Sequence, residues 1–205
     1  MIGYDNVGTF ILTAIGIIIS LTIHEYSHAL VSTKLGDKTP EMYGRLTLNP
    51  LAHIDILGLI SLFIFRFGWA KPVPIDSSYY KDRRKGIILT SLAGPVSNLI
   101  LAFFSLLILR AAKPQSRGID LFLIILAQLN TGLAVFNMIP LSPLDGSKIL
   151  AELFGGRVAD LIYSLERYGT FLIFILLWIP AVQNVISFIT QGVLSGLYAL
   201  AGIFA

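Results

Sequence analysis

The sequence predicts an all-α polytopic membrane protein, and its composition and its long apolar segments are the observations that predict it. The chain has 205 residues, of which 55% are hydrophobic and 13% are charged, and its mean hydropathy is +0.79. Soluble domains carry about 25% charged residues, so the composition excludes an ordinary globular protein. Apolar runs of about 20 residues, enough to cross a bilayer, occur near residues 7–31, 86–109, 119–140 and 182–204. A fifth run, at 160–180, has polar residues in its first half, so we expect about five full transmembrane helices.

The apolar segment at residues 54–69 is too short to be a further span. Asp55 and Arg66 interrupt it, which leaves a clean apolar stretch of only about 12 residues, below the length that a spanning helix needs. We therefore expect this segment to be re-entrant or interfacial. The spans 7–31 and 119–140 then end on the same side of the membrane.

The distribution of basic residues agrees with that topology. Twelve of the fifteen Lys and Arg residues lie in the loops 32–53, 66–85 and 141–167, which the topology places on one side. The positive-inside rule makes that side cytoplasmic and puts the N-terminus outside. The surplus of positive charge therefore requires no nucleic-acid partner. The first apolar segment lacks a basic n-region and a cleavage site, so we interpret it as a retained span and not as a signal peptide.

A small β element is expected between the first two full spans. Residues 42–49 alternate in the β manner and are closed by Asn49 and Pro50, which predicts a short strand. The prolines in segment 71–75 make that segment extended.

The first span contains an H-E-x-x-H motif, His24-Glu25-Tyr26-Ser27-His28. On a helix, residues four apart lie on one face, so the two imidazoles can bind one Zn²⁺ while Glu25 polarises a metal-bound water. Glu25 is the only acidic or basic residue between positions 7 and 31 apart from the histidines. Ionisable groups in an apolar span are costly and mark function. The chain has no cysteine, so a metal site must use His, Asp or Glu.

Asp145 and His53 are the candidates for a third protein ligand, which a catalytic zinc site requires. Asp145 follows the span 119–140, and the topology places it on the side and at the depth of the motif. Its flanking prolines stiffen the backbone, and Gly146 lets the chain turn. His53 sits beside Asp55 in a polar loop, where a solvated or hydrogen-bonded histidine is the expected structure. The sequence therefore favours Asp145.

Two spaced motifs resemble the site-2 protease family of intramembrane zinc metalloproteases. They are the H-E-x-x-H motif in an early span and the pattern N-x-x-P-x-x-P-L-D-G, residues 137–146, at the end of a later one. The stretches 44–50, 69–74 and 93–98 resemble the compact prokaryotic branch of that family. The resemblance extends from about residue 20 to about residue 150, and the C-terminal helices match only as apolar spans.

The resemblance implies one zinc ion per chain with His24, His28 and Asp145 as its ligands and Glu25 as the general base. Asn137 then orients the substrate or stabilises the oxyanion, and an interhelical hydrogen bond is the alternative. Asn98 presents the same two alternatives, and there we expect a structural role. Ser147 stands where many relatives carry a second glycine, but it touches no ligand.

We expect residues 1–205 to form a single membrane-embedded protease domain, with a catalytic core at about 7–150 and C-terminal helices at about 158–205. PDZ and CBS domains, which occur elsewhere in the family, are not expected. The expected location is a prokaryotic plasma membrane, with the active site toward the cytoplasm. The expected partners are the lipid bilayer and a transmembrane protein substrate, which adds to the edge of strand 42–49; the oligomeric state is open.

The alternative function is a zinc-binding membrane protein without hydrolysis, such as a transporter or a scaffold. Transport favours carboxylates and histidines strung across several spans. This chain concentrates them at one depth.

Overall fold

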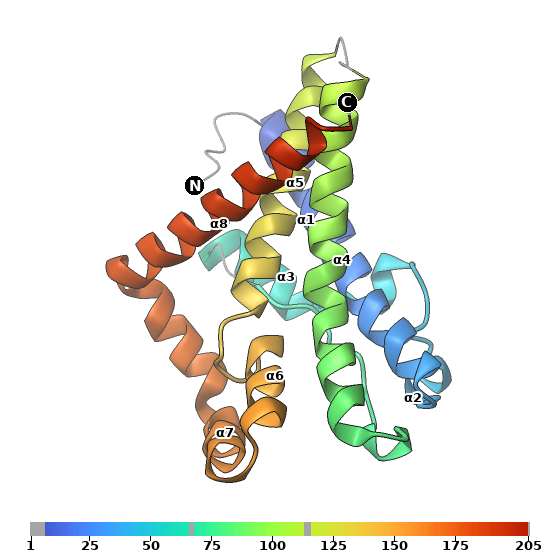
Figure 1. Cartoon of the computed structure of the whole chain (residues 1–205). Coiled ribbons are helices and arrows are strands. Elements are labelled where there is room, and N and C mark those ends of the chain that lie inside the picture. The colour runs from blue at the N-terminus through green and yellow to red at the C-terminus, as the bar shows by residue number, and fades with distance from the viewer. Residues whose placement is uncertain (1–6, 66–67, 113–115, 205) are drawn as a thin grey trace.

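The computed structural model describes residues 7–65, 68–112 and 116–204, and these form a helical bundle (Figure 1). The helices are α1 (Val7–Lys34), α2 (Thr39–Met42), α3 (Ile56–Phe65), α4 (Arg83–Ala111), α5 (Arg117–Asn137), α6 (Asp145–Phe154), α7 (Gly156–Trp178) and α8 (Pro180–Ala201). Five of them, α1, α4, α5, α7 and α8, are long and apolar enough to cross a membrane. The predicted fold class is therefore confirmed, and the chain is a multi-pass membrane protein.

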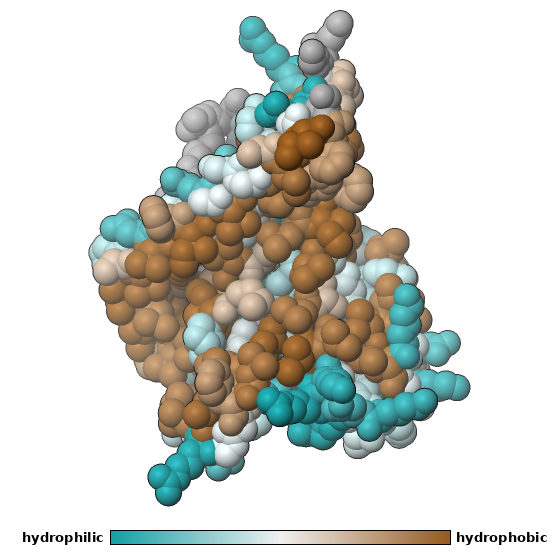
Figure 2. Space-filling view, in the orientation of Figure 1, coloured by the Kyte–Doolittle hydropathy of each residue, from teal (hydrophilic) through white to brown (hydrophobic). Residues whose placement is uncertain are grey.

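Helices α1, α4 and α5 pack against one another and form the centre of the bundle. Small and polar side chains fill their interface, as is usual between helices in a membrane. Asn130 donates to Ser20 Oγ at 2.8 Å and accepts from Asn98 Nδ2 at 2.7 Å. Large apolar side chains instead cover much of the outer surface, and a broad hydrophobic zone occupies the middle of the molecule in Figure 2.

Between α1 and α4, the chain segments that enter and leave helix α3 lie side by side. Helix α3 has 10 residues, a length of about 15 Å against a hydrocarbon core of about 30 Å. Ile54 and Ala70, on either side of it, form an antiparallel bridge, and Lys71 N donates to His53 O at 2.8 Å. This return supports the expected re-entrant or interfacial segment. Arg66 and Lys113, which contribute to the charge asymmetry, lie outside the described residues.

The strand predicted at residues 42–49 is wrong. Gly44 adopts a φ of +65° and turns the chain immediately after α2. Thr47 Oγ1 then accepts from the main-chain N–H of Asn49, and Asn49 Oδ1 caps the following turn. These local side-chain bonds compete with strand pairing. Within the described ranges, the β element is reduced to the bridge between Ile54 and Ala70.

Helices α7 and α8 meet in a bend at Pro180 and diverge from it (Figure 1). Helix α8 then approaches the end of α4, where Ala201 packs with Leu106, and the Arg110 guanidinium lies 4.5 Å from the ring centre of Tyr198. An apolar cavity of about 760 Å³ remains between α8 and the pair α4–α5.

Asp37 connects the end of α1 to the extended segment 71–76. Its side chain is fully buried and accepts hydrogen bonds from Ser32 Oγ (2.8 Å), Thr39 N (2.8 Å) and Asp76 N (2.9 Å). Burial alone would raise the pKa of Asp37, but these hydrogen bonds outweigh burial and hold the pKa below its ordinary value. Asp37 is therefore ionised and anchors the segment that covers the site described below.

Asp37→Asn should lower the free energy of unfolding by about 1.5–3 kcal/mol at neutral pH, because an amide cannot accept all three bonds. A carboxylate whose folded pKa is depressed stabilises the protein above its unfolded pKa, and this contribution is lost as the pH falls through the folded pKa. The difference between wild type and variant should therefore be constant above about pH 5 and shrink below about pH 4. Thermal unfolding in detergent across this range measures it. A difference that grows toward low pH would contradict the assignment.

Candidate metal centre

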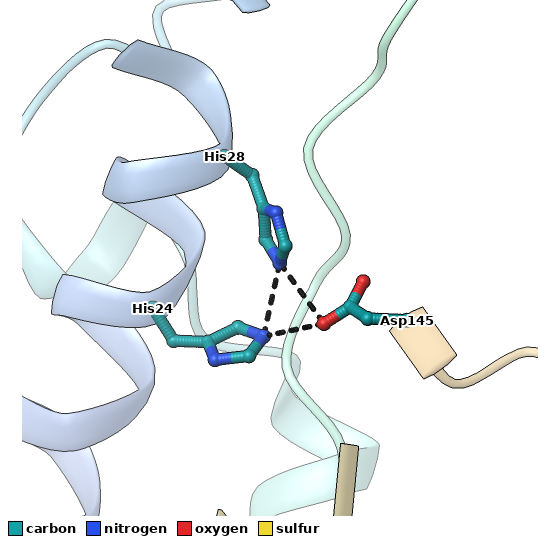
Figure 3. A group of neighbouring side chains, drawn as sticks. All are labelled: His24, His28 and Asp145. Atoms are coloured by element: carbon teal, nitrogen blue, oxygen red, sulfur yellow. Dashed lines mark hydrogen bonds and ion pairs between the residues drawn. The ribbon is translucent and has the colours of Figure 1, made fainter. Parts of the chain in front are cut away.

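Three buried side chains from two distant parts of the chain meet at one point (Figure 3). His24 and His28 lie one turn apart on the same face of α1, and Asp145 is the first residue of α6. The two histidine Nε2 atoms are 3.0 Å apart, and each lies 3.3 Å from Asp145 Oδ2. The residues are 5%, 7% and 6% exposed. The structure thus brings together the three side chains that the sequence singles out as metal ligands.

The triangle has the dimensions of one face of a tetrahedral zinc site. Ligand atoms about 2.0 Å from a tetrahedral zinc are about 3.3 Å from one another, which matches the 3.0 and 3.3 Å separations. Asp145 Oδ2 is buried and, among the described residues, has no partner beyond the two imidazoles that it faces. The donor set therefore fits a zinc ion.

Hydrogen bonds at the Nδ1 atoms, on the side of each ring away from the cluster, fix the tautomers of both histidines. His24 Nδ1 lies 2.7 Å from Asn98 Oδ1, and His28 Nδ1 lies 2.7 Å from the Thr90 carbonyl. Both partners accept hydrogen bonds, since Asn98 uses its amide nitrogen on Ser20 O and Asn130 Oδ1. Each Nδ1 therefore carries the proton, and each Nε2 presents a lone pair. Two lone pairs and a carboxylate oxygen in one buried space form a donor set suited to a cation.

Gly94 on α4 makes room for this cluster. A Cβ atom built at Gly94 would overlap the rings of both His24 and His28. The next residue, Pro95, lies inside α4, where it removes one main-chain donor from the helix. The absence of a side chain at residue 94 therefore lets α4 approach α1 at the level of the site.

Glu25 points into the same cavity, which has a volume of about 320 Å³. Its Oε2 accepts a hydrogen bond of 3.0 Å from the main-chain N–H of Val73. Val73 is buried between two prolines in the extended segment 71–76, which we name the strap. The strap is held at one end by the Lys71–His53 main-chain bond and at the other by Asp37. Glu25 is thus oriented by main chain and lies apart from the three clustered side chains.

The other candidate residues have separate positions. Asn137 lines the cavity, and its Nδ2 donates to Leu133 O of its own helix at 3.0 Å. His53 is buried, with Nε2 2.8 Å from Thr47 O, and it is not part of the clustered ligand group. Asn98 has the expected bonds between helices, but one of them reaches His24, a contact that the sequence did not predict. The Val73 contact was not predicted either, because a main-chain N–H leaves no signal in a sequence.

Asn98→Leu should weaken zinc affinity by about 10- to 100-fold, the usual cost of losing a partner that orients a histidine ligand. The physical reason is the loss of the acceptor at His24 Nδ1, which frees the ring and its tautomer. Competition with a chromogenic zinc chelator measures the affinity. Ser105→Ala on the same helix is the control, because the partner of Ser105 Oγ within the described part of the chain is Leu101 O of its own helix. Equal affinities for Asn98→Leu and wild type would refute the positioning role.

Comparison with known proteins gives matches to peptidases and to proteins named as zinc metalloproteases. The profile of Peptidase family M50 matches residues 106–179, a range that contains Asp145. Three relatives share the name "Putative zinc metalloprotease". YwhC of Bacillus subtilis is 44% identical over 80% of this chain and 78% of its own length. Rip2 of Mycolicibacterium smegmatis is 32% identical over 87% and 71%, and MJ0611 of Methanocaldococcus jannaschii is 32% identical over 69% and 70%. No solved structure gives a significant match.

Proposed function

The chain belongs to peptidase family M50, and we propose that His24, His28 and Asp145 hold its zinc ion while Glu25 is the general base. The protein is an intramembrane zinc metalloprotease. The observation that carries the residue assignment is the triangle of 3.0 and 3.3 Å between three ligand atoms inside an apolar bundle. Its substrates are membrane proteins in a lipid bilayer.

Hydrolysis requires an activated water and a proton for the departing amine. The three side chains would hold the zinc ion, which would supply a Lewis acid that polarises the scissile carbonyl and lowers the pKa of water to about 7. Glu25 accepts a proton from the attacking water and delivers it to the amine nitrogen as the C–N bond breaks. The Val73 N–H donates to Oε2 of Glu25, which leaves Oε1 to take part in this proton transfer. Asn137, at the cavity wall, orients the substrate carbonyl or stabilises its developing charge.

We further propose that the site opens toward the cytoplasm of a prokaryotic cell. The basic loops that follow α1 and precede α4 gather at the end of the bundle that carries α2 and α6, and Figure 2 shows a group of hydrophilic side chains at that end, below α4 and α2. The positive-inside rule makes this end cytoplasmic. A transmembrane substrate must unwind near this end, because its peptide bonds are otherwise protected by helical hydrogen bonds.

The rival function, zinc binding without hydrolysis, is disfavoured by Glu25. A transporter or a scaffold needs metal ligands but has no use for a carboxylate that binds no metal. Glu25 is not part of the clustered ligand group, and the Val73 N–H holds it in the same cavity. The separation of Glu25 from the three clustered side chains supports a role on a bound water instead of a role as a ligand.

The function is tested with purified protein in lipid vesicles that contain a helical transmembrane peptide. We expect cleavage that a zinc chelator abolishes and added zinc restores, with about one zinc ion per chain, as expected for a single catalytic site. A protein that binds zinc stoichiometrically and leaves a panel of such peptides intact would support the rival function.

Val73→Pro removes the donor to Glu25 and keeps an extended backbone, since proline favours such conformations. We expect kcat to fall about tenfold or more, because a misplaced general base loses part of a contribution of about 10²–10⁴. Bound zinc should be unchanged. Val73→Ala, which keeps the N–H and shortens the side chain, is the control. If Val73→Ala were as slow as Val73→Pro, side-chain packing and not the hydrogen bond would be responsible.

A further inference from the structure

Lys148 contributes a cation to the catalytic cavity that neither the metal site nor the general base uses. It lies on α6, three residues after Asp145, and its side chain lines the same cavity as Glu25 and both histidines. Residues three apart on a helix are neighbours, with Cβ atoms about 5–6 Å from each other. The flexible side chain of Lys148 can therefore bring its ammonium group toward the place where the scissile peptide must lie.

Glu152, the acidic residue best spaced to pair with Lys148 on α6, already interacts with other residues. Glu152 is four residues further along α6, the spacing that favours an ion pair. Its Oε1 instead faces Arg83 Nη1 at 3.5 Å and accepts a hydrogen bond from Tyr163 Oη at 3.1 Å. Lys148 forms no ion pair and no hydrogen bond with any of the described residues.

The charges that face the cavity leave one positive charge uncompensated. The two carboxylates of Glu25 and Asp145 would balance the charge of a bound divalent zinc ion. Arg83 also lines the cavity, but Glu152 compensates it. Lys148 remains, so a substrate segment that carries a negative charge beside it completes the balance.

We propose that Lys148 is a specificity-determining residue that selects substrates with an acidic side chain close to the scissile bond. The inference rests on the proposed protease function and names the substrate chemistry of that same site. An extended chain advances about 3.3 Å per residue, so the acidic residue lies within about three residues of the cleaved bond. The alkyl stem of Lys148 lets the ammonium follow the substrate carboxylate, and the exposure of the side chain keeps the energy modest.

The test uses a transmembrane peptide that is cleaved in phosphatidylcholine vesicles, which carry no net charge. Single positions, three on each side of the cleaved bond, are changed in turn to Glu, Gln or Lys. At one or more of these positions, wild type should cleave the Glu peptide about fivefold faster in kcat/KM than the Gln peptide, and the Lys peptide more slowly still.

Lys148→Glu should reverse the order, so that the Lys peptide is preferred, and Lys148→Gln should remove the preference. The matched control is Lys38→Glu, the same charge change at an exposed lysine that does not line the cavity; it should keep the wild-type order.

An unchanged Glu-to-Gln ratio in both Lys148 variants would overturn the inference while leaving the protease function intact. The same assay in vesicles with added phosphatidylserine separates the peptide from the lipid: if Lys148 responded to the anionic lipid and not to the peptide residue, it would be assigned to lipid headgroups and the inference would be overturned as well. Failure of zinc-loaded wild type to cleave any peptide would instead defeat the proposed function and the inference together.

Discussion

Gly94→Ala should abolish both zinc binding and proteolysis. The added methyl group would overlap His24 and His28, and it faces the space between their Nε2 atoms. The neighbours are two rings fixed by Asn98 and the Thr90 carbonyl, so they cannot move aside without losing their Nδ1 bonds. We expect less than about a tenth of the wild-type zinc content after purification and activity reduced at least about 10³-fold, because a closely packed site does not absorb an added methyl group. Zinc analysis and the vesicle cleavage assay measure the two effects.

Gly132→Ala is the matched control for this prediction. Gly132 lies inside α5, a neighbouring span, and a Cβ atom there meets nothing within 4 Å. This variant should keep its zinc and its activity, and alanine should stabilise the helix slightly, since glycine is the poorer helix former. If Gly94→Ala bound zinc as wild type does, the close approach of α4 to the ligands would not be a requirement of the site.

Glu25→Gln should retain zinc and lose proteolysis. The glutamine side chain has nearly the same shape as glutamate and can still accept the Val73 hydrogen bond through its amide oxygen, but it cannot take a proton from water. The expected loss in kcat is about 10²–10⁴-fold, the contribution of a general acid–base group. KM should change little, because the substrate does not depend on this carboxylate for binding.

Zinc content, measured beside activity, distinguishes a general base from a metal ligand. Glu25→Gln should contain as much zinc as wild type. Asp145→Asn should bind zinc more weakly, because the two imidazoles are the partners that the described residues offer to Asp145 Oδ2. Glu41→Gln, on α2 and outside the cavity, controls for the change of charge. Loss of zinc in Glu25→Gln would assign this residue to the metal instead of to the water.

The sequence was sufficient to predict the helical membrane fold and the three clustered side chains. Each depends on a strong, local constraint: the length of apolar runs, the one-face spacing of His24 and His28, and the side of the membrane on which α5 ends. That last constraint came from the shortness of segment 54–69, and the Ile54–Ala70 bridge agrees with it. A long-range meeting of α1 with Asp145 could thus be inferred from topology.

The features that could not be predicted depend either on competition between weak local bonds or on contacts between distant parts of the chain. Residues 42–49 have strand-like alternation, but Asn49 and Thr47 satisfy the main chain locally, and among the described residues no partner strand is adjacent. The contact of Asn98 with His24 was also beyond reach, because a buried amide in an apolar span has several possible partners. The boundary between the last two spans follows from the apolar runs 160–180 and 182–204, but the angle between α7 and α8 requires tertiary information that these runs do not contain.

The most direct test of the account is X-ray absorption spectroscopy at the zinc edge of the purified wild-type protein. We predict a four-coordinate zinc with two imidazole nitrogens at about 2.0–2.1 Å and two oxygens, one from Asp145 and one from water. Asp145→Asn should change the oxygen contribution while both imidazoles remain. A zinc site with fewer than two imidazoles, or one that Asp145→Asn leaves identical, would contradict the assignment of His24, His28 and Asp145.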